Sequence, residues 1–139
     1  MSFNYEPVTY GEIKDNKGTD LKVGSQQYNM LQLATPQDHC IADVLVKHLG
    51  KTSCFTDIIV WDNEVPCTLT SKGNIFSGNS KKRFSIHDIT SMQTFPEDYD
   101  FNGNPVRYIC GMSVPPVMIK RIVTRLIESG VFAHSFTEK

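Results

Sequence analysis

The stretch PPVMIKRIVTRLIESG, residues 115–130, carries the clearest structural signal in the chain. Pro115 and Pro116 open it, and proline suits the first turn of a helix, where its missing N–H would have no intrahelical partner. Gly130 supplies the stop. Apolar residues recur at helical spacing and predict one wide apolar face: Val117, Met118, Ile122, Val123, Leu126 and Ile127. Such a face needs a packing partner, and that partner surface need not belong to this chain.

Residues 85–96 predict a second, shorter helix. The run from Ser85 to Asp88 is a capping box, in which the serine and the acid three positions later satisfy free N–H groups at a helix start. We expect this helix to run through Gln93 and Pro96 to end it. His87 is interpreted as a structural residue of the helix start. The acidic, turn-rich segment 97–105 is expected to be a hinge.

Another helix is predicted in the first half of the chain. Thr35 has the chemistry of an N-cap, Pro36 suits the first helical position, and Gly50 follows the last apolar residue of a helical pattern. The sequence before it is polar and broken by turn signals. Its weak pattern leaves two alternatives open around residues 10–23, a hairpin or an ordered loop.

Residues 55–70 predict an antiparallel hairpin. The run from Phe55 to Trp61 is rich in β-branched residues, residues 62–64 have turn chemistry, and residues 65–70 follow as a returning strand. Trp61 is expected to pack in the core. Glycines 73 and 78 mark a loop beyond the hairpin.

Composition and charge limit the possible functions. The chain has 139 residues, about one domain, and a formal net charge of −1, so any contact with nucleic acid must come from a local basic patch. No apolar run is long enough for a membrane span, and residues 1–9 are too polar for a signal peptide, so a cytoplasmic protein is expected.

The cysteines do not indicate a metal site. Cys40, Cys54, Cys67 and Cys110 form no C-x-x-C pair, and the four histidines are equally scattered. Structural zinc sites usually show close ligand pairs. We therefore expect no metal and reduced, mostly buried thiols.

Three stretches in the second half share a pattern. They are residues 64–74, which contain Pro66-Cys67-Thr68-Leu69-Thr70; residues 83–99, which end in Gln93-Thr94-Phe95-Pro96-Glu97-Asp98-Tyr99; and Gly111-Met112-Ser113-Val114-Pro115-Pro116. In order and separation they resemble the cytosine-5 DNA methyltransferases, specifically a P-x-T-[LI]-[TS]-x-x-G strand and loop and the last two conserved blocks. Residues 1–60 then take the place of the family's variable target recognition region.

The resemblance implies a divided enzyme. The family flips the target cytosine out of the duplex, adds a cysteine thiolate to carbon 6 and transfers a methyl group from S-adenosylmethionine. The chain has no F-x-G-x-G cofactor loop, no P-C-Q nucleophile motif, no E-N-V and no Q-x-R-x-R. Pro66-Cys67-Thr68 lies too far along the chain to be the nucleophile motif. The implied role is the DNA-recognising C-terminal portion or subunit, inactive alone, with S-adenosylmethionine bound mainly by a partner chain.

The resemblance also implies site residues. The strand and loop contact the DNA backbone in the family, which together with the basic residues gives the candidate DNA-binding set Thr68, Thr70, Ser71, Lys72, Lys82 and Arg83. For the basic run 81–83, phosphate contact and an internal ion pair both remain open.

The last block of the family borders the methyl-donor pocket, which makes Met112, Ser113 and Val114 the candidate cofactor-binding residues. Two departures from the family pattern stand out. Met112 replaces an asparagine, and His87-Asp88 replaces an arginine and a glutamate.

The expected fold class is α/β, with a mixed α+β recognition lobe and a C-terminal amphipathic helix that docks on a missing Rossmann-like catalytic domain. The expected segments are a target recognition lobe at 1–80, a conserved helix and hinge at 81–102, and a docking block at 103–139. The expected partners are double-stranded DNA and the catalytic chain, with no membrane. Two alternatives remain: a non-catalytic interaction or regulatory module derived from such an enzyme, and a small enzyme built on Cys67 or Cys110. The DNA target and the biological role are not readable from these residues.

Overall fold

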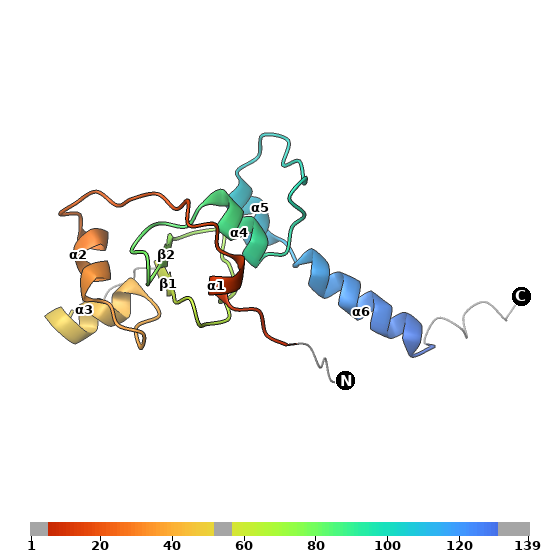
Figure 1. Ribbon diagram of the computed structural model, residues 1–139, viewed down its shortest axis with the longest axis horizontal. Helices are drawn as coiled ribbons and strands as arrows, with labels where there is room; N and C mark the ends of the chain where they lie inside the picture. The colour runs from red at the N-terminus through yellow and green to blue at the C-terminus, as the bar shows by residue number, and fades with distance from the viewer. Residues whose placement is uncertain (1–5, 52–56, 131–139) are drawn as a thin grey trace, which may run out of the picture.

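The structure is a computed structural model that describes residues 6–51 and 57–130. Within these ranges the chain mixes helices with a two-stranded sheet, so the α/β class is confirmed at this coarse level. Figure 1 shows the sheet at the centre, with helices on both sides and the last helix projecting from the body. In chain order the elements are α1 (Tyr10–Ile13), α2 (Gln26–Leu33), α3 (Ile41–Leu49), β1 (Ile58–Val60), β2 (Ile75–Ser77), α4 (Ile86–Met92), α5 (Val106–Met112) and α6 (Pro116–Glu128).

The sheet is parallel, and the predicted hairpin is wrong. Ile58 pairs with Ile75, and the register continues to Val60 and Ser77. The turn at residues 62–64 does form, but residues 65–70 make no strand. All three residues of β2 are buried, as expected for a strand covered on both faces. Residues 55 and 56 of the predicted strand lie outside the described residues.

The sheet separates two hydrophobic cores. Ile59 and Phe76 are paired across the strands and belong to the first core, whereas Val60 and Ile75 belong to the second. Alternate residues of a strand point to opposite faces, so each face has its own layer of helices. Helices α2 and α3 cover the first face, and α1, α4 and α5 lie on the other side (Figure 1).

The first core confirms that Trp61 is buried. It also shows that the helix predicted to start after Thr35 begins later. Trp61 is buried, and its indole N–H donates to the carbonyl of Asp38 at 3.1 Å. The carboxylate of Asp38 accepts hydrogen bonds from the N–H and the hydroxyl of Thr35, at 2.7 and 2.8 Å. Thr35 was predicted to cap the helix, but these bonds close a turn over residues 35–38 that precedes it. Helix α3 begins at Ile41 instead, and it ends as expected at Gly50, which is left-handed with φ 60°.

The second core joins distant parts of the chain. The ring of Tyr10 stacks on that of Phe84, with centroids 4.4 Å apart. Val60, Ile89 and Cys110 belong to the same cluster. The cluster therefore contains residues from all three predicted segments, 1–80, 81–102 and 103–139, whose boundaries stay a prediction.

The N-terminal part contains two helices that the sequence did not predict. Helix α1 lies within residues 10–23 in place of a hairpin, and Thr19 bridges Arg83 in antiparallel fashion. Helix α2 begins after Ser25, whose hydroxyl accepts the N–H of Tyr28 at 3.2 Å. Its sequence is largely polar, which is why periodicity gave no signal.

The C-terminal half follows its predictions more closely. Helix α4 ends at Met92 with Gln93 as C-cap, close to the predicted end, and α6 begins at Pro116. Helix α5, which follows the turn-rich segment 97–105, was not predicted.

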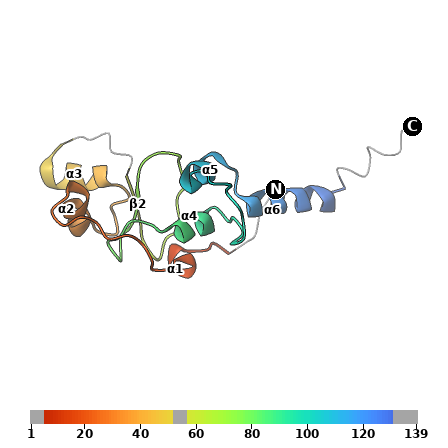
Figure 2. The same cartoon turned by 90° about the horizontal axis from the view of Figure 1, so that it is seen from above.

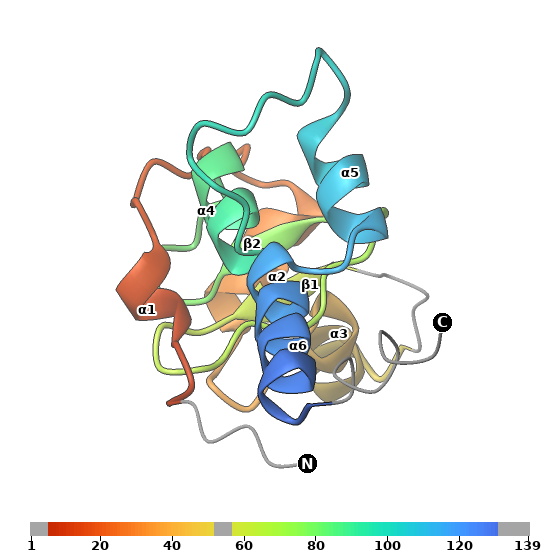
Figure 3. The ribbon, with the colours of Figure 1, turned by 90° about the vertical axis from the view of Figure 1, so that its right-hand side faces the viewer.

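Helix α6 has no buried residue and extends away from both cores, as Figures 1 and 2 show. Figure 3 shows α6 end-on in front of the sheet. Every helix among the described residues is too short or too polar to span a bilayer.

Candidate nucleic-acid interface

The predicted DNA-contacting loop is part of the crossover between the two parallel strands. Parallel strands are usually joined through a helix, but residues 61–74 contain neither helix nor strand. Leu69 anchors this segment in the second core, while Thr68 and Lys72 on either side of it are exposed. The crossover therefore places a hydroxyl and an ammonium group at the surface.

Within this loop, Thr70 has a structural contact of its own. Its hydroxyl donates to the carbonyl of Lys72 at 2.7 Å. A hydroxyl has one proton to donate, so in this conformation Thr70 has none left for a phosphate oxygen. Gly73, three residues after Thr70, has φ 85°, the left-handed conformation that glycine adopts without strain. Thr70 and Gly73 thus shape the loop that carries Lys72.

Helix α5 supports the loop from behind. The Arg107 guanidinium donates from Nη2 to the Lys72 carbonyl at 3.0 Å. One turn further, a Cβ on Gly111 would lie only 2.5 Å from the backbone nitrogen of Ser71. Real Cβ atoms essentially never come so close, so the helix and the loop are in direct backbone contact. Ser71, half-buried, lies at this contact.

The three side chains of the basic run 81–83 have different contacts. The Lys81 ammonium lies 4.9 Å from the centroid of the Trp61 ring, in a cation–π contact. Lys82 makes an ion pair with Asp20 at 3.2 Å, one of the two alternatives for this run, and its contact with phosphate stays a prediction. Arg83 is exposed, and among the described residues neither it nor Lys72 has an ion-pair partner. Lys72 and Arg83 are therefore the available cations of the predicted set.

The start of α4 gathers two carboxylates and an imidazole. Ligand atoms of Asp15, His87 and Asp88 lie within 4.8 Å of one another. Asp88 accepts from the backbone N–H groups of Ser85 and Asp15, at 2.9 and 3.2 Å, and Asp15 accepts from the Ser85 hydroxyl at 3.0 Å. These hydrogen bonds form the predicted capping box, and both carboxylates serve as acceptors that stabilise the start of α4.

The candidate cofactor-binding residues offer few polar groups. Met112 and Val114 are exposed, and the Ser113 hydroxyl donates to the carbonyl of Ile109, one turn earlier in α5. They border a cavity of about 370 Å³ whose walls also include Pro66 and Gln93. Contact of these residues with S-adenosylmethionine stays a prediction.

The cysteines lack the features of a nucleophile. Of the described thiols only that of Cys110 is buried, whereas Cys40 is half-buried and Cys67 is exposed, so the expectation of mostly buried thiols is wrong. Desolvation raises the pKa of Cys110 and of Cys67, and the Glu64 carboxylate raises that of Cys67 further. A raised pKa reduces the thiolate fraction at neutral pH, so neither thiol is activated. Cys54 lies outside the described residues.

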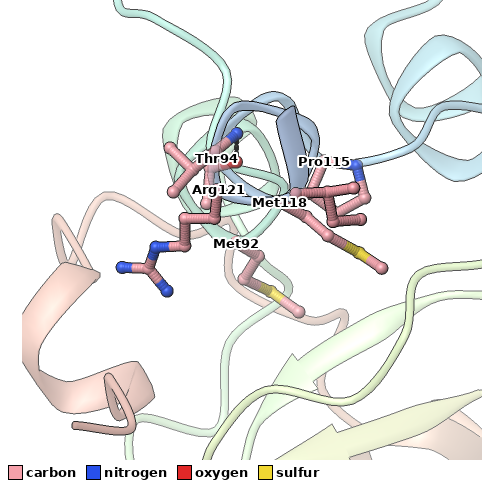
Figure 4. Close-up of a pocket in the computed structure, with 7 residues that line it drawn as sticks. Met92, Thr94, Pro115, Met118 and Arg121 are labelled. Carbon is pink, nitrogen blue, oxygen red and sulfur yellow. Dashed lines mark hydrogen bonds between the residues drawn. The ribbon is translucent and has the colours of Figure 1, made fainter. Parts of the chain in front are cut away.

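A second cavity lies where α6 leaves the body. It has a volume of about 380 Å³, and its walls come from the end of α4 and the first turns of α6. Figure 4 shows the side chains of Met92, Met118 and Arg121 around it, and the hydrogen bond from the Val117 N–H to the Thr94 hydroxyl, 3.1 Å long. Met118 and Ile119 are about half exposed and continue the apolar surface along the helix.

The sequence did not predict two contacts of the candidate interface. They are the hydrogen bond from Arg107 to the Lys72 carbonyl and the cation–π contact of Lys81 with Trp61. Arg107 lies outside the three stretches with a family pattern, and no local signal connects it to Lys72. Lys81 was treated as part of a charge run, although its aromatic partner is twenty residues earlier. Comparisons with protein-family models, with curated proteins and with solved structures found no match to this chain.

Proposed function

We propose that the chain is the DNA-recognising C-terminal portion or subunit of a cytosine-5 DNA methyltransferase. The observation that carries this proposal is the convergence of the three stretches that resemble the family. Gln93 donates to the carbonyl of Cys110, Gly111 lies against Ser71, and the Val117 N–H donates to Thr94. Stretches separated in the sequence thus form one continuous unit.

Double-stranded DNA binds at the exposed side of this unit. Lys72 and Arg83 have cationic groups without a carboxylate partner among the described residues, and Thr68 adds an exposed hydroxyl. Phosphate oxygens accept hydrogen bonds from such groups, and each neutralised phosphate steepens the salt dependence by about 0.9 in log–log slope. Lys82 joins this set by exchanging Asp20 for a phosphate, because an exposed ion pair contributes only about 0–1 kcal/mol.

Catalysis belongs to a partner chain that binds S-adenosylmethionine and supplies the thiolate. Helix α6 docks on that chain through its apolar face, of which Met118, Val123 and Ile127 are exposed. The helix has three cationic residues, Lys120, Arg121 and Arg125, and one acid, Glu128. Arg125 already pairs with Glu128 at 3.3 Å, so the apolar face, and not charge, defines the matching surface of the partner, which is apolar.

Reconstitution tests this division of labour. The full chain is mixed with a chain that carries the P-C-Q loop, and transfer of labelled methyl groups to duplex DNA is measured. Each chain alone is expected to be inactive and the mixture active. Methylation by this chain alone would contradict the proposal.

A gel-shift series tests DNA recognition in the same complex. Lys72→Ala with Thr68→Ala is expected to weaken binding about tenfold and to flatten the salt dependence by about one unit. Lys22→Ala is the matched control, because Lys22 is exposed and lies before α2, away from the loop. A complex that forms through α6 but binds no duplex would instead support the interaction module, which the exposed face of α6 also favours.

A further inference from the structure

The Lys72 carbonyl is held by two donors, although it lies at the surface. The Thr70 hydroxyl approaches it to 2.7 Å and Arg107 Nη2 to 3.0 Å. Two donors fix the orientation of the peptide between Lys72 and Gly73, where the backbone turns into the left-handed conformation. The conformation of the loop is therefore determined partly by α5.

Arg107 is itself held in place. Its Nε is buried without a hydrogen-bond partner, and the Asp57 carboxylate, whose Oδ2 is also buried without one, lies in its electrostatic environment. Burial lowers the pKa of Arg107, the Asp57 charge raises it and the Arg83 charge lowers it. Arg83 itself pairs with Phe76 of β2 in an antiparallel bridge, two residues beyond the end of the loop at Asn74. An arginine keeps its charge despite these effects, so its hydrogen bond to Lys72 is charge-assisted.

We propose that Arg107 is a positioning residue for DNA binding, which holds the loop so that Lys72 and Arg83 bind the phosphate backbone together. This inference rests on the proposed DNA contact. Arg107 and Gly111 are four residues apart on α5, so one face of the helix makes both contacts with the loop. Arg107 acts through Lys72 and does not bind a phosphate itself.

Fluorescence anisotropy of the full chain with a pool of short labelled duplexes tests this inference across a series of salt concentrations. Arg107→Met is expected to weaken binding roughly three- to tenfold, the effect of losing one hydrogen bond. The slope of affinity against salt should stay unchanged, because no phosphate contact is lost. Arg107→Lys, which keeps one donor, should recover part of the affinity. Lys22→Met is the matched control and should bind as the wild type does.

A second variant removes the other donor without touching the Asp57 environment. Thr70→Val has nearly the same shape and should reproduce the weaker affinity with an unchanged slope, even if Arg107→Met folds poorly. Unchanged affinity in both variants overturns the inference, and so does a slope that falls by about one unit in Arg107→Met, which would make Arg107 a phosphate ligand. If neither the wild-type chain nor its complex with the catalytic chain binds duplex, the proposed function fails as well. If Lys72→Ala weakens binding and neither positioning variant does, the inference alone fails.

Discussion

Replacing Gly111 with alanine tests the contact between α5 and the crossover loop. In a helix this change normally stabilises a protein by about 1 kcal/mol, because glycine has the greater backbone freedom when unfolded. Here the new methyl group would lie 2.5 Å from Ser71 N, 2.6 Å from Thr70 C and 2.8 Å from Ser71 Cα. All three are backbone atoms, which cannot move aside as the end of a flexible side chain can.

Forcing such atoms apart costs typically about 1–3 kcal/mol. After the gain in helix propensity, we expect Gly111→Ala to destabilise the chain by up to about 2 kcal/mol, measured by urea denaturation at constant m-value. Tyr108→Ala is the control, because Tyr108 is exposed on the same helix and should change stability by less than about 0.5 kcal/mol. If Gly111→Ala instead stabilises the chain by the full gain in helix propensity, about 1 kcal/mol, α5 does not lie against the loop, and the argument for Arg107 loses its basis.

Three further substitutions have defined outcomes. Asp38→Ala should cost about 1–3 kcal/mol, because it leaves the Thr35 N–H unpaired. Burial raises the pKa of Asp38, but the Thr35 hydrogen bonds and the Lys47 charge lower it overall. Its stabilisation is thus present above the unfolded pKa and lost as the pH falls through the folded one, and acid titration should show this loss in the wild type but not in the variant. Met118→Asp should leave the melting temperature nearly unchanged, since Met118 is 53% exposed, yet reduce co-purification of the catalytic chain; undiminished co-purification would place the docking surface elsewhere. Cys67→Ser should retain methyl transfer in the reconstituted enzyme, because the raised pKa of this thiol leaves it unactivated, and loss of activity would revive the small-enzyme alternative.

The sequence predicted the helix ends that are set by neighbouring residues. The capping box at Ser85 and the two prolines before α6 satisfy or remove free N–H groups within one turn, so they are readable from the sequence. The pairing of Ile58 with Ile75 is different, because it joins residues far apart and nothing near either strand specifies a parallel partner. Helix α2 was missed since its polar residues give almost no periodic signal.

The candidate site shows the same division. Exposure of Thr68 and Lys72 agrees with the surface role that the resemblance implied, and their contact with DNA stays a prediction. The sequence could not decide between the two interpretations of Lys82, because its partner Asp20 is sixty-two residues away. The contact between Arg107 and the Lys72 carbonyl depends on how α5 packs, so it appears only in three dimensions.

The parallel register also restricts how this protein can change during evolution. A one-residue slip between β1 and β2 would move Phe76 and Ile75 to the opposite cores, so the strands cannot slide to absorb an altered length. Both ends of residues 61–74 are therefore fixed points. Under the proposed function, a change of DNA specificity at this loop should arise by exchange of its exposed side chains, such as Thr68 and Lys72, and not by a shift of the strands that hold its ends.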